Sequence, residues 1–198
     1  MVKNRITNKI KIMTKETTTH VCPVERAGAL DMNLRRLVHH PQKIFGNYIQ
    51  EGMTVLDFGC GPGFFTIDVA KMVGENGKVI AADLQQGMLD KVNLKMNKHK
   101  VGHRINLHQC GADTIGLKEQ VDFAYAFFVV HEVPDQEKLF KDLSEVVKKG
   151  GKFYMAEPRG HVKKNDFEAS VALAKKQGFY PFEHKKVAIG RVVVFEKG

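Results

Sequence analysis

A glycine-rich turn directly after a short apolar run constrains the fold of this chain more than any other feature. Residues 55–66 read VLDFGCGPGFFT, in which an apolar strand ends in Asp57 and glycines follow at positions 59, 61 and 63. Glycine lets the backbone pass close to a ligand where any Cβ would clash. Such a turn from strand into helix predicts an α/β fold that binds a nucleoside at the end of the strand.

The chain after residue 53 alternates short β-branched or aromatic runs with longer helical runs. This alternation is typical of a parallel sheet covered by helices on both faces. The expected strands are 54–58, 78–83, 105–109, 121–127 and 152–157, followed by an antiparallel pair at 182–187 and 191–196 around Gly190. The expected helices are 64–73, 87–97, 136–148 with Gly150 and Gly151 as its C-cap, and 166–177.

The N-terminal quarter differs from the rest in charge. The 198-residue chain has a net charge of +9, and residues 1–50 hold nine Lys and Arg against three Asp and Glu. We interpret residues 1–19 as a flexible basic tail and residues 20–198 as one domain. Within it, 20–52 is a helical N-terminal cap, with a second helix from Pro41 to near Gly52, and 53–198 is the cofactor-binding α/β core. The basic tail keeps nucleic acid open as an alternative partner.

Composition excludes several other classes of protein. The longest apolar run, residues 123–130, is too short to span a bilayer, and lysines and arginines interrupt the first fifteen residues. We therefore expect a cytoplasmic protein without a membrane segment. The cysteines Cys22, Cys60 and Cys110 form no C-x-x-C pair and are expected to be free thiols. The spacing of His20 and Cys22 with His39 and His40 matches no familiar ligand pattern, so we expect no metal site.

The spacing of the turn separates it from other nucleotide motifs. The dinucleotide fingerprint needs a glycine at position 64, where this chain has Phe64, and no Gly-Lys-Ser/Thr of a phosphate-binding loop follows. The next expected strand ends in Asp83, twenty residues after Gly63. A carboxylate at that place can accept hydrogen bonds from both hydroxyls of a ribose.

These segments together resemble the class I, seven-stranded family of S-adenosylmethionine-dependent methyltransferases, in particular its methyltransferase type 11 or quinone-biosynthesis-like small-molecule branch. The matching segments are VLDFGCGPG, VIAADL, GAD, VDFAYAFFVVHEV and VVKKGGKFYMAEP. The resemblance implies a doubly wound, mostly parallel seven-stranded sheet with an antiparallel C-terminal strand and helices on both faces. It also implies S-adenosyl-L-methionine as cofactor and S-adenosyl-L-homocysteine as product.

The resemblance places the cofactor on particular residues. Asp57 would lie near the amino group of its methionine part, Asp83 at the ribose hydroxyls and Leu84 on the adenine face. Ala112 and Asp113 would meet the adenine edge, and the carbonyl of Phe127 would face the methionine amino group. The remaining expected contacts lie in the glycine turn: Phe58, Gly59, Cys60, Gly61 and Gly63.

The acceptor is less defined. Methyl transfer from a sulfonium is an in-line displacement that needs mainly positioning. His131, after the fourth strand, is the candidate general base, although it equally suits a pocket-shaping or helix-capping role. Phe-Phe-Val-Val-His-Glu after that strand disfavours exocyclic base N-methylation, and the lack of cysteine after Cys110 excludes cytosine C5 chemistry. We expect a small-molecule acceptor; an RNA methyltransferase, a non-catalytic cofactor-binding protein and an NAD-dependent oxidoreductase are the alternatives.

Overall fold

The computed structural model describes residues 39–187 and 190–198. The predicted basic tail, 1–19, and the part of the predicted helical cap before His39 lie outside these ranges. Cys22 also lies outside the described residues.

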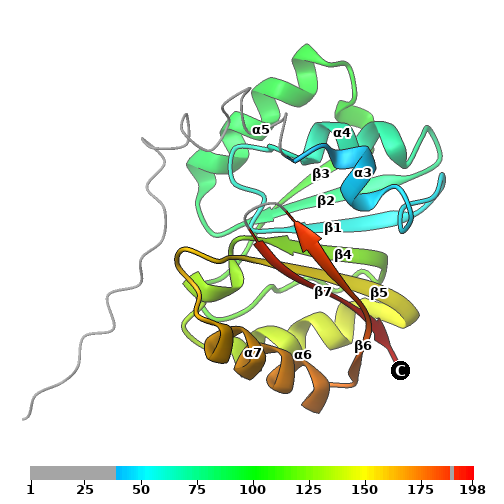
Figure 1. Cartoon of the computed structure of the whole chain (residues 1–198). Coiled ribbons are helices and arrows are strands. Elements are labelled where there is room, and N and C mark those ends of the chain that lie inside the picture. The colour runs from blue at the N-terminus through cyan, green and yellow to red at the C-terminus, as the bar shows by residue number, and fades with distance from the viewer. Residues whose placement is uncertain (1–38, 188–189) are drawn as a thin grey trace, which may run out of the picture.

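A seven-stranded sheet in the order β3-β2-β1-β4-β5-β7-β6 runs through the described part of the chain (Figure 1). Its strands are β1 (Thr54–Phe58), β2 (Lys78–Asp83), β3 (Ile105–Gln109), β4 (Val121–Phe127), β5 (Val147–Pro158), β6 (Phe179–Val187) and β7 (Gly190–Lys197). The pairs among β1 to β5 are parallel, and β7 is antiparallel to both β5 and β6. The predicted mostly parallel, doubly wound sheet with an antiparallel C-terminal strand is confirmed.

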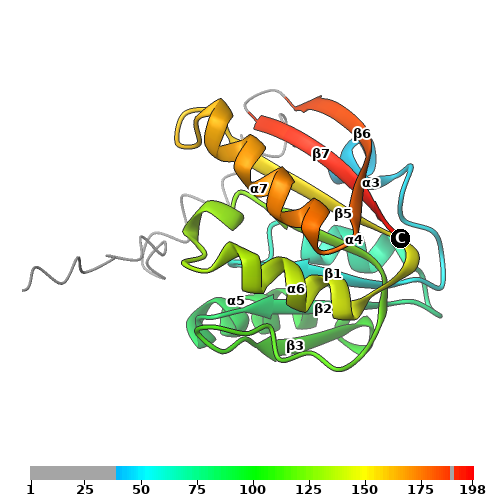
Figure 2. The same cartoon turned by 90° about the horizontal axis from the view of Figure 1, so that it is seen from below.

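Helices cover both faces of this sheet. The helices are α3 (Pro41–Phe45), α4 (Thr66–Met72), α5 (Gln86–Lys98), α6 (Gln136–Val146) and α7 (Lys164–Lys176), with the short 3-10 helices η2 (Gly102–Arg104) and η3 (Val130–Glu132). Figures 1 and 2 show α3, α4 and α5 on one face and α6 and α7 on the other. None of the helices in the described ranges is long and apolar enough to cross a membrane.

The central strands are apolar on both sides because two cores meet at the sheet. Val55 faces the core beneath α3 to α5, and its neighbour Leu56 faces the core beneath α6 and α7. Tyr125 likewise lies in the first of these cores and its neighbour Ala124 in the second. Successive side chains of a strand point to opposite faces, so a strand buried on both faces reads as a continuous apolar run.

Two predicted helix ends were wrong. α3 ends at Phe45 and not near Gly52, since the chain turns at Gly46 while Tyr48 and Ile49 still bury their side chains. α6 ends at Val146, and Gly150 and Gly151 do not cap it.

Those two glycines instead lie in an irregular start of β5. Val121 pairs with Val147, but Phe123 already pairs with Lys152, so the intervening residues of β5 form a bulge. Gly150 has a φ of +74°, a conformation that glycine adopts without a steric penalty.

The order of the strands fixes where a ligand can bind. After β1 the chain proceeds outward through β2 and β3, and then returns to place β4 on the other side of β1. In open α/β sheets of this kind, the ligand crevice lies at the carboxyl ends of the strands where the order reverses. The carboxyl ends of β1, β2 and β4 are therefore the place to look for a site.

Candidate functional site

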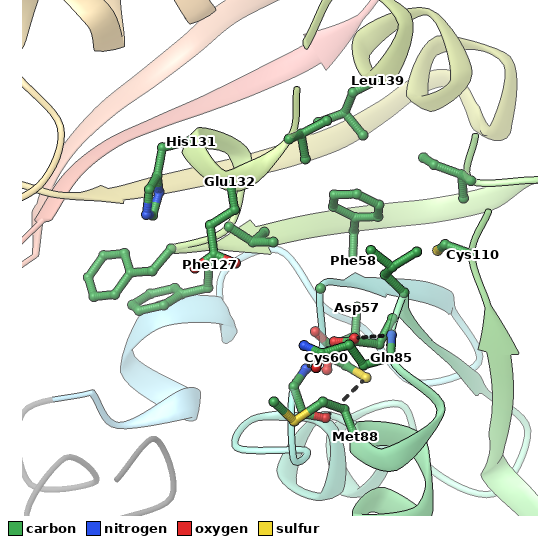
Figure 3. Close-up of a pocket in the computed structure, with 18 of the residues that line it drawn as sticks. Asp57, Phe58, Cys60, Gln85, Met88, Cys110, Phe127, His131, Glu132 and Leu139 are labelled. Carbon is green, nitrogen blue, oxygen red and sulfur yellow. Dashed lines mark hydrogen bonds between the residues drawn. The ribbon is translucent and has the colours of Figure 1, made fainter. Parts of the chain in front are cut away.

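One large cavity of about 1390 Å³ opens at that edge of the sheet. Figure 3 shows Asp57, Cys60, Gln85 and Met88 on one side of it and Phe127, His131 and Glu132 on the other. Of the residues expected to bind the cofactor or to act as base, the following line the cavity: Asp57, Phe58, Gly59, Cys60, Gly61, Asp83, Leu84, Ala112, Asp113, Phe127 and His131. Gly63 does not line it. Since a drug-sized ligand fills a few hundred Å³ to about 1000 Å³, the cavity has room for a nucleoside and a second small molecule.

The glycine turn is held against the neighbouring strand. The backbone N–H groups of Gly59 and Cys60 both donate to the carbonyl of Ala82, at 2.8 and 3.0 Å. The Lys95 Nζ on α5 donates to the carbonyl of Pro62 at 2.6 Å. The backbone of β2 and a side chain of α5 thus fix the floor of the cavity before any ligand binds.

The three glycines have positive φ values but differ in what a side chain would meet. A Cβ on Gly59 would lie 2.4 Å from Cγ2 of Val129, and one on Gly63 would lie 3.1 Å from Cγ2 of Val92. A Cβ on Gly61 has no atom within 4 Å. Packing within the protein therefore requires glycine at 59 and favours it at 63, whereas at Gly61 the missing side chain leaves open space in the cavity.

Asp83, at the end of β2, points its carboxylate into the turn. Its Oδ2 accepts from the N–H of Gly61 at 2.8 Å, and its Oδ1 accepts from the N–H of Gln85 at 2.9 Å. Burial raises the pKa of Asp83, while these backbone hydrogen bonds act against that rise. Each carboxylate oxygen has a second lone pair, so both remain able to accept from a ligand.

Asp57, at the end of β1, is buried under the turn. Its Oδ2 accepts from the hydroxyl of Thr66 at 2.6 Å. Burial raises the pKa of Asp57 to about 7; the Thr66 hydrogen bond lowers it, and the charge of Asp83 raises it further. The site therefore holds a carboxyl group that gives up its proton readily when a cation comes close.

The rim beside Asp83 combines apolar and polar contacts. Leu84 is 41% exposed although it is a large apolar residue. Ala112 and Asp113 are also exposed, in the loop after β3. In the described part of the chain the Asp113 carboxylate makes no hydrogen bond, so it is available to a donor on a ligand. On α6, Asp142 accepts from the hydroxyl of Thr114 at 2.8 Å and anchors this loop.

The two cysteines in the cavity are poor nucleophiles. Burial raises the pKa of the Cys60 thiol well above its ordinary value, and it raises that of Cys110 to about 12. The thiolate is the reactive form, so both side chains stay protonated and inert at neutral pH.

The opposite side of the cavity begins where β4 ends. The rings of Phe127 and Phe128 lie 4.4 Å apart, and that of His39 packs edge-on at 5.2 Å from Phe127. His131, on η3, hydrogen-bonds through Nδ1 to the carboxylate of Glu157 on β5. Apolar rings and a histidine–carboxylate pair therefore meet at this side. Within the described residues no group of three or more His, Cys, Asp or Glu side chains is arranged for a metal ion.

Sequence reasoning missed the cavity residues that come from helices and from the loop after β5. Met88 and Gln85 reach it from the start of α5, Leu139 and Asp142 from α6, and Arg159 from the loop after β5. Of these, only Arg159 stands in a stretch with a sequence signal, the basic run RGHVKKND. The others read as ordinary positions of amphipathic helices.

The comparisons with known proteins agree with this geometry. A family model described as "Methyltransferase domain" matches residues 49–187. The chain is 29% identical over 144 residues to a demethylmenaquinone methyltransferase of Alkalihalophilus pseudofirmus, covering 73% of this chain and 58% of that one. It is 30% identical over 110 residues to a ubiquinone/menaquinone biosynthesis C-methyltransferase of Escherichia fergusonii, covering 55% and 44%. The chain thus spans about half the length of these relatives.

A solved structure has the same fold over nearly its whole length. It is a SAM-dependent methyltransferase from Aquifex aeolicus, 25% identical to this chain, with a TM-score of 0.79 and coverage of 87% of this chain and 97% of that one.

Proposed function

The chain belongs to the methyltransferase-domain family, and on that premise we propose that it transfers the methyl group of S-adenosylmethionine to a small-molecule acceptor. The observation that carries this proposal is that one cavity is lined both by the glycine turn with Asp83 and by the apolar residues and His131 that follow β4. The names of the quinone-biosynthesis relatives support a small molecule as acceptor. A cytoplasmic location belongs to the same proposal.

The residues of the cavity suit the cofactor in charge and shape. Asp83 would hold the two ribose hydroxyls through the free lone pairs of its oxygens. The open space above Gly61 suits a closely packed ligand, because a Cβ there would fill it. Leu84 would cover a face of the adenine, and burying its exposed apolar surface favours binding.

The charged end of the cofactor fits the buried acid. Asp57 would face the methionine amino group, whose positive charge favours the ionised carboxylate. The Phe127 carbonyl would accept from the same amino group. Ala112 and Asp113 would meet the adenine edge, and the backbone from Phe58 to Gly63 would support the ribose and methionine parts.

When bound, the cofactor supplies an electrophilic methyl group on a sulfonium. The protein holds the acceptor in line with it. Such positioning is worth roughly 7 to 11 kcal/mol in a well-oriented reaction. Phe127 and Phe128 provide an apolar wall for the acceptor, which excludes water from the reacting atoms.

Transfer to RNA is the weaker proposal. It rests on the excess of positive charge in residues 1–50, most of which lie outside the described ranges. The described cavity presents several acidic side chains, Asp57, Asp83, Asp113 and Glu132, which disfavour a polyanion.

Calorimetric titration tests the proposal. We expect S-adenosylmethionine and S-adenosylhomocysteine to bind the wild-type protein and NAD to compete with neither. Asp83→Ala should weaken both by about 10- to 100-fold, because it removes charge-assisted hydrogen bonds worth about 1.5–3 kcal/mol. Asp90→Ala, an exposed acid on α5, is the matched control and should bind like the wild type.

Asp83 also holds the turn, so the Asp83→Ala protein must first be shown to melt cooperatively. Binding of NAD in place of S-adenosylmethionine, or wild-type affinity in Asp83→Ala, would contradict the proposal.

A further inference from the structure

Glu157 is a buried carboxylate that the cofactor site does not use. Its side chain is 1% exposed at the carboxyl end of β5. Its Oε1 accepts from the backbone N–H of Val130 at 2.9 Å, and its Oε2 hydrogen-bonds with Nδ1 of His131. A buried charge is costly unless it is paired. The Glu157 carboxylate and the segment with Val130 and His131 therefore fix each other in position.

A strained turn brings the two side chains together. Phe128 has a φ of +64°, which is rare for an aromatic residue, and its N–H donates to the carbonyl of Ala156 at 2.9 Å. The chain thereby leaves β4 and places η3 beside the end of β5. Backbone strain of this kind persists only where the surroundings enforce it, and it concentrates at functional sites.

The pair leaves one imidazole nitrogen free. With Nδ1 as the donor to Glu157, Nε2 carries the lone pair, and among the described residues His131 makes no other hydrogen bond. The side chain is one-quarter exposed and lines the large cavity. A base within the cavity, oriented by a buried carboxylate behind it, is the arrangement that proton abstraction requires.

We infer, resting on the proposed methyl transfer, that His131 takes a proton from the acceptor, that Glu157 positions His131, and that the acceptor bears this proton on its reacting atom. In the step, the acceptor atom forms a bond to the methyl carbon and the bond from that carbon to sulfur breaks. The electron pair of the broken bond stays on the now neutral sulfur. The proton of the acceptor atom passes to Nε2 of His131.

A second cavity gives this proton a way out. It has a volume of about 290 Å³ and is lined by His131, Gln136, Glu157, His161, Val162, Asp166 and Ser170. All but one of these side chains are polar, so the cavity suits water. Since His131 lines both cavities, it can release the proton while cofactor and acceptor fill the large one.

The charges around His131 favour its protonated form. The hydrogen bond to Glu157 raises the pKa of His131, Glu132 adds to the rise, and burial opposes it. The titratable and charged groups that face it from the packed elements are Glu157 of β5, Glu132 of η3, Arg159 and His161 of the loop after β5, and Asp166 of α7. Removing the charge of Glu157 should therefore lower the pKa of His131.

The activity test uses full-length protein, labelled S-adenosylmethionine and two sets of acceptors. Phenols, thiols and primary amines bear a proton on the reacting atom, whereas thioethers and tertiary amines do not. We expect label only in the first set, a loss of about 10²- to 10⁴-fold in kcat for His131→Gln, and about 10- to 100-fold for Glu157→Gln. His103→Gln, an exposed histidine on η2, is the matched control and should retain wild-type kcat.

Two readouts separate these roles from a structural one. By NMR of ring-labelled histidine, Glu157→Gln should lower the pKa of His131, and the pH profile of kcat should move with it. The calorimetric affinity for S-adenosylmethionine should stay within about twofold in both variants.

Label in the second set, label in neither set, or equal kcat in His131→Gln and His103→Gln would overturn the inference. An unchanged pH profile in Glu157→Gln would refute the positioning role. Failure of the wild-type protein to bind S-adenosylmethionine would instead refute the proposed function, which calorimetry reveals separately.

Discussion

Replacing Asp57 by asparagine is expected to stabilise the cofactor-free protein at and above neutral pH. Asp57 is buried under the glycine turn, and burial raises its pKa to about 7 from an ordinary value of 3.8. Asparagine has the shape of the neutral carboxyl group and can still accept the hydrogen bond from Thr66. The substitution therefore removes a buried charge without opening a cavity.

The magnitude follows from the difference between the folded and unfolded pKa values. Between about pH 4 and about pH 7 the folded protein binds more protons at Asp57 than the unfolded chain does, so stability falls as pH rises through this window. The full difference corresponds to about 4 kcal/mol, an upper limit reached near pH 7. Asp57→Asn should recover up to that amount at about pH 8 and little at about pH 4, where the wild-type carboxyl is protonated in the folded protein and only partly ionised in the unfolded chain.

Thermal unfolding across this pH range measures the effect. In a chain of this size 1 kcal/mol shifts Tm by about 2–4 °C, so the gain should reach about 10 °C near pH 8. The protein must be stripped of cofactor, because a ligand that favours ionised Asp57 would hide the difference.

Asp122→Asn is the control of opposite sign. Its carboxylate accepts from Lys148 and from the N–H of Thr54, and these contacts lower its pKa. That substitution should destabilise the protein at neutral pH, with the loss fading in acid. Equal Tm values for Asp57→Asn and wild type at both pH extremes, or a gain that is the same at both, would refute the assignment of a buried, neutralised carboxyl to Asp57.

Two further predictions concern the same turn. Gly59→Ala should unfold or strongly destabilise the protein, because its Cβ would overlap Val129. Gly61→Ala should fold with a loss of about 1 kcal/mol from its positive φ, and it should weaken S-adenosylmethionine binding. Denaturant unfolding and calorimetry measure the two effects, and similar stability in both variants would contradict the difference in packing. The affinity for S-adenosylmethionine should rise from about pH 6 to about pH 8 as Asp57 ionises, and Asp57→Asn should flatten this dependence. Calorimetry in buffers of different ionisation enthalpy should show proton release when the wild type binds. A flat pH profile of the wild-type affinity would refute the pairing of Asp57 with the methionine amino group.

Some of the fold follows directly from local sequence. The first four strands have the predicted bounds. β1, β2 and β4 are mostly buried apolar runs, whereas β3 alternates apolar and polar residues. The helix ends were less predictable. α6 and β5 follow each other without a loop, and only pairing with β4 shows that Gly150 belongs to a bulge. A tertiary contact therefore decides what the glycines do there.

The site was predictable only where it depends on the order and direction of the strands. Asp57 and Asp83 end adjacent strands, so parallel pairing alone places them at one edge. The packing role of Gly59 was not visible in the sequence. A side chain at position 59 would clash with Val129, which lies seventy residues later in the chain. The contact between Glu157 and His131 was not visible either, since it depends on the strained turn at Phe128.

Three features at the carboxyl edge of the sheet work against the stability of the folded protein. Asp57 is a carboxyl group buried where its charge is unfavourable, Phe128 has a strained backbone, and Glu157 is a buried carboxylate. Costs of this kind persist where the surrounding structure enforces them, and all three lie at the carboxyl edge of the sheet, Asp57 and Phe128 at the large cavity and Glu157 at the second one. If Asp57→Asn stabilises the protein while it weakens cofactor binding, it will show that this edge of the sheet is shaped by ligand chemistry at the expense of stability.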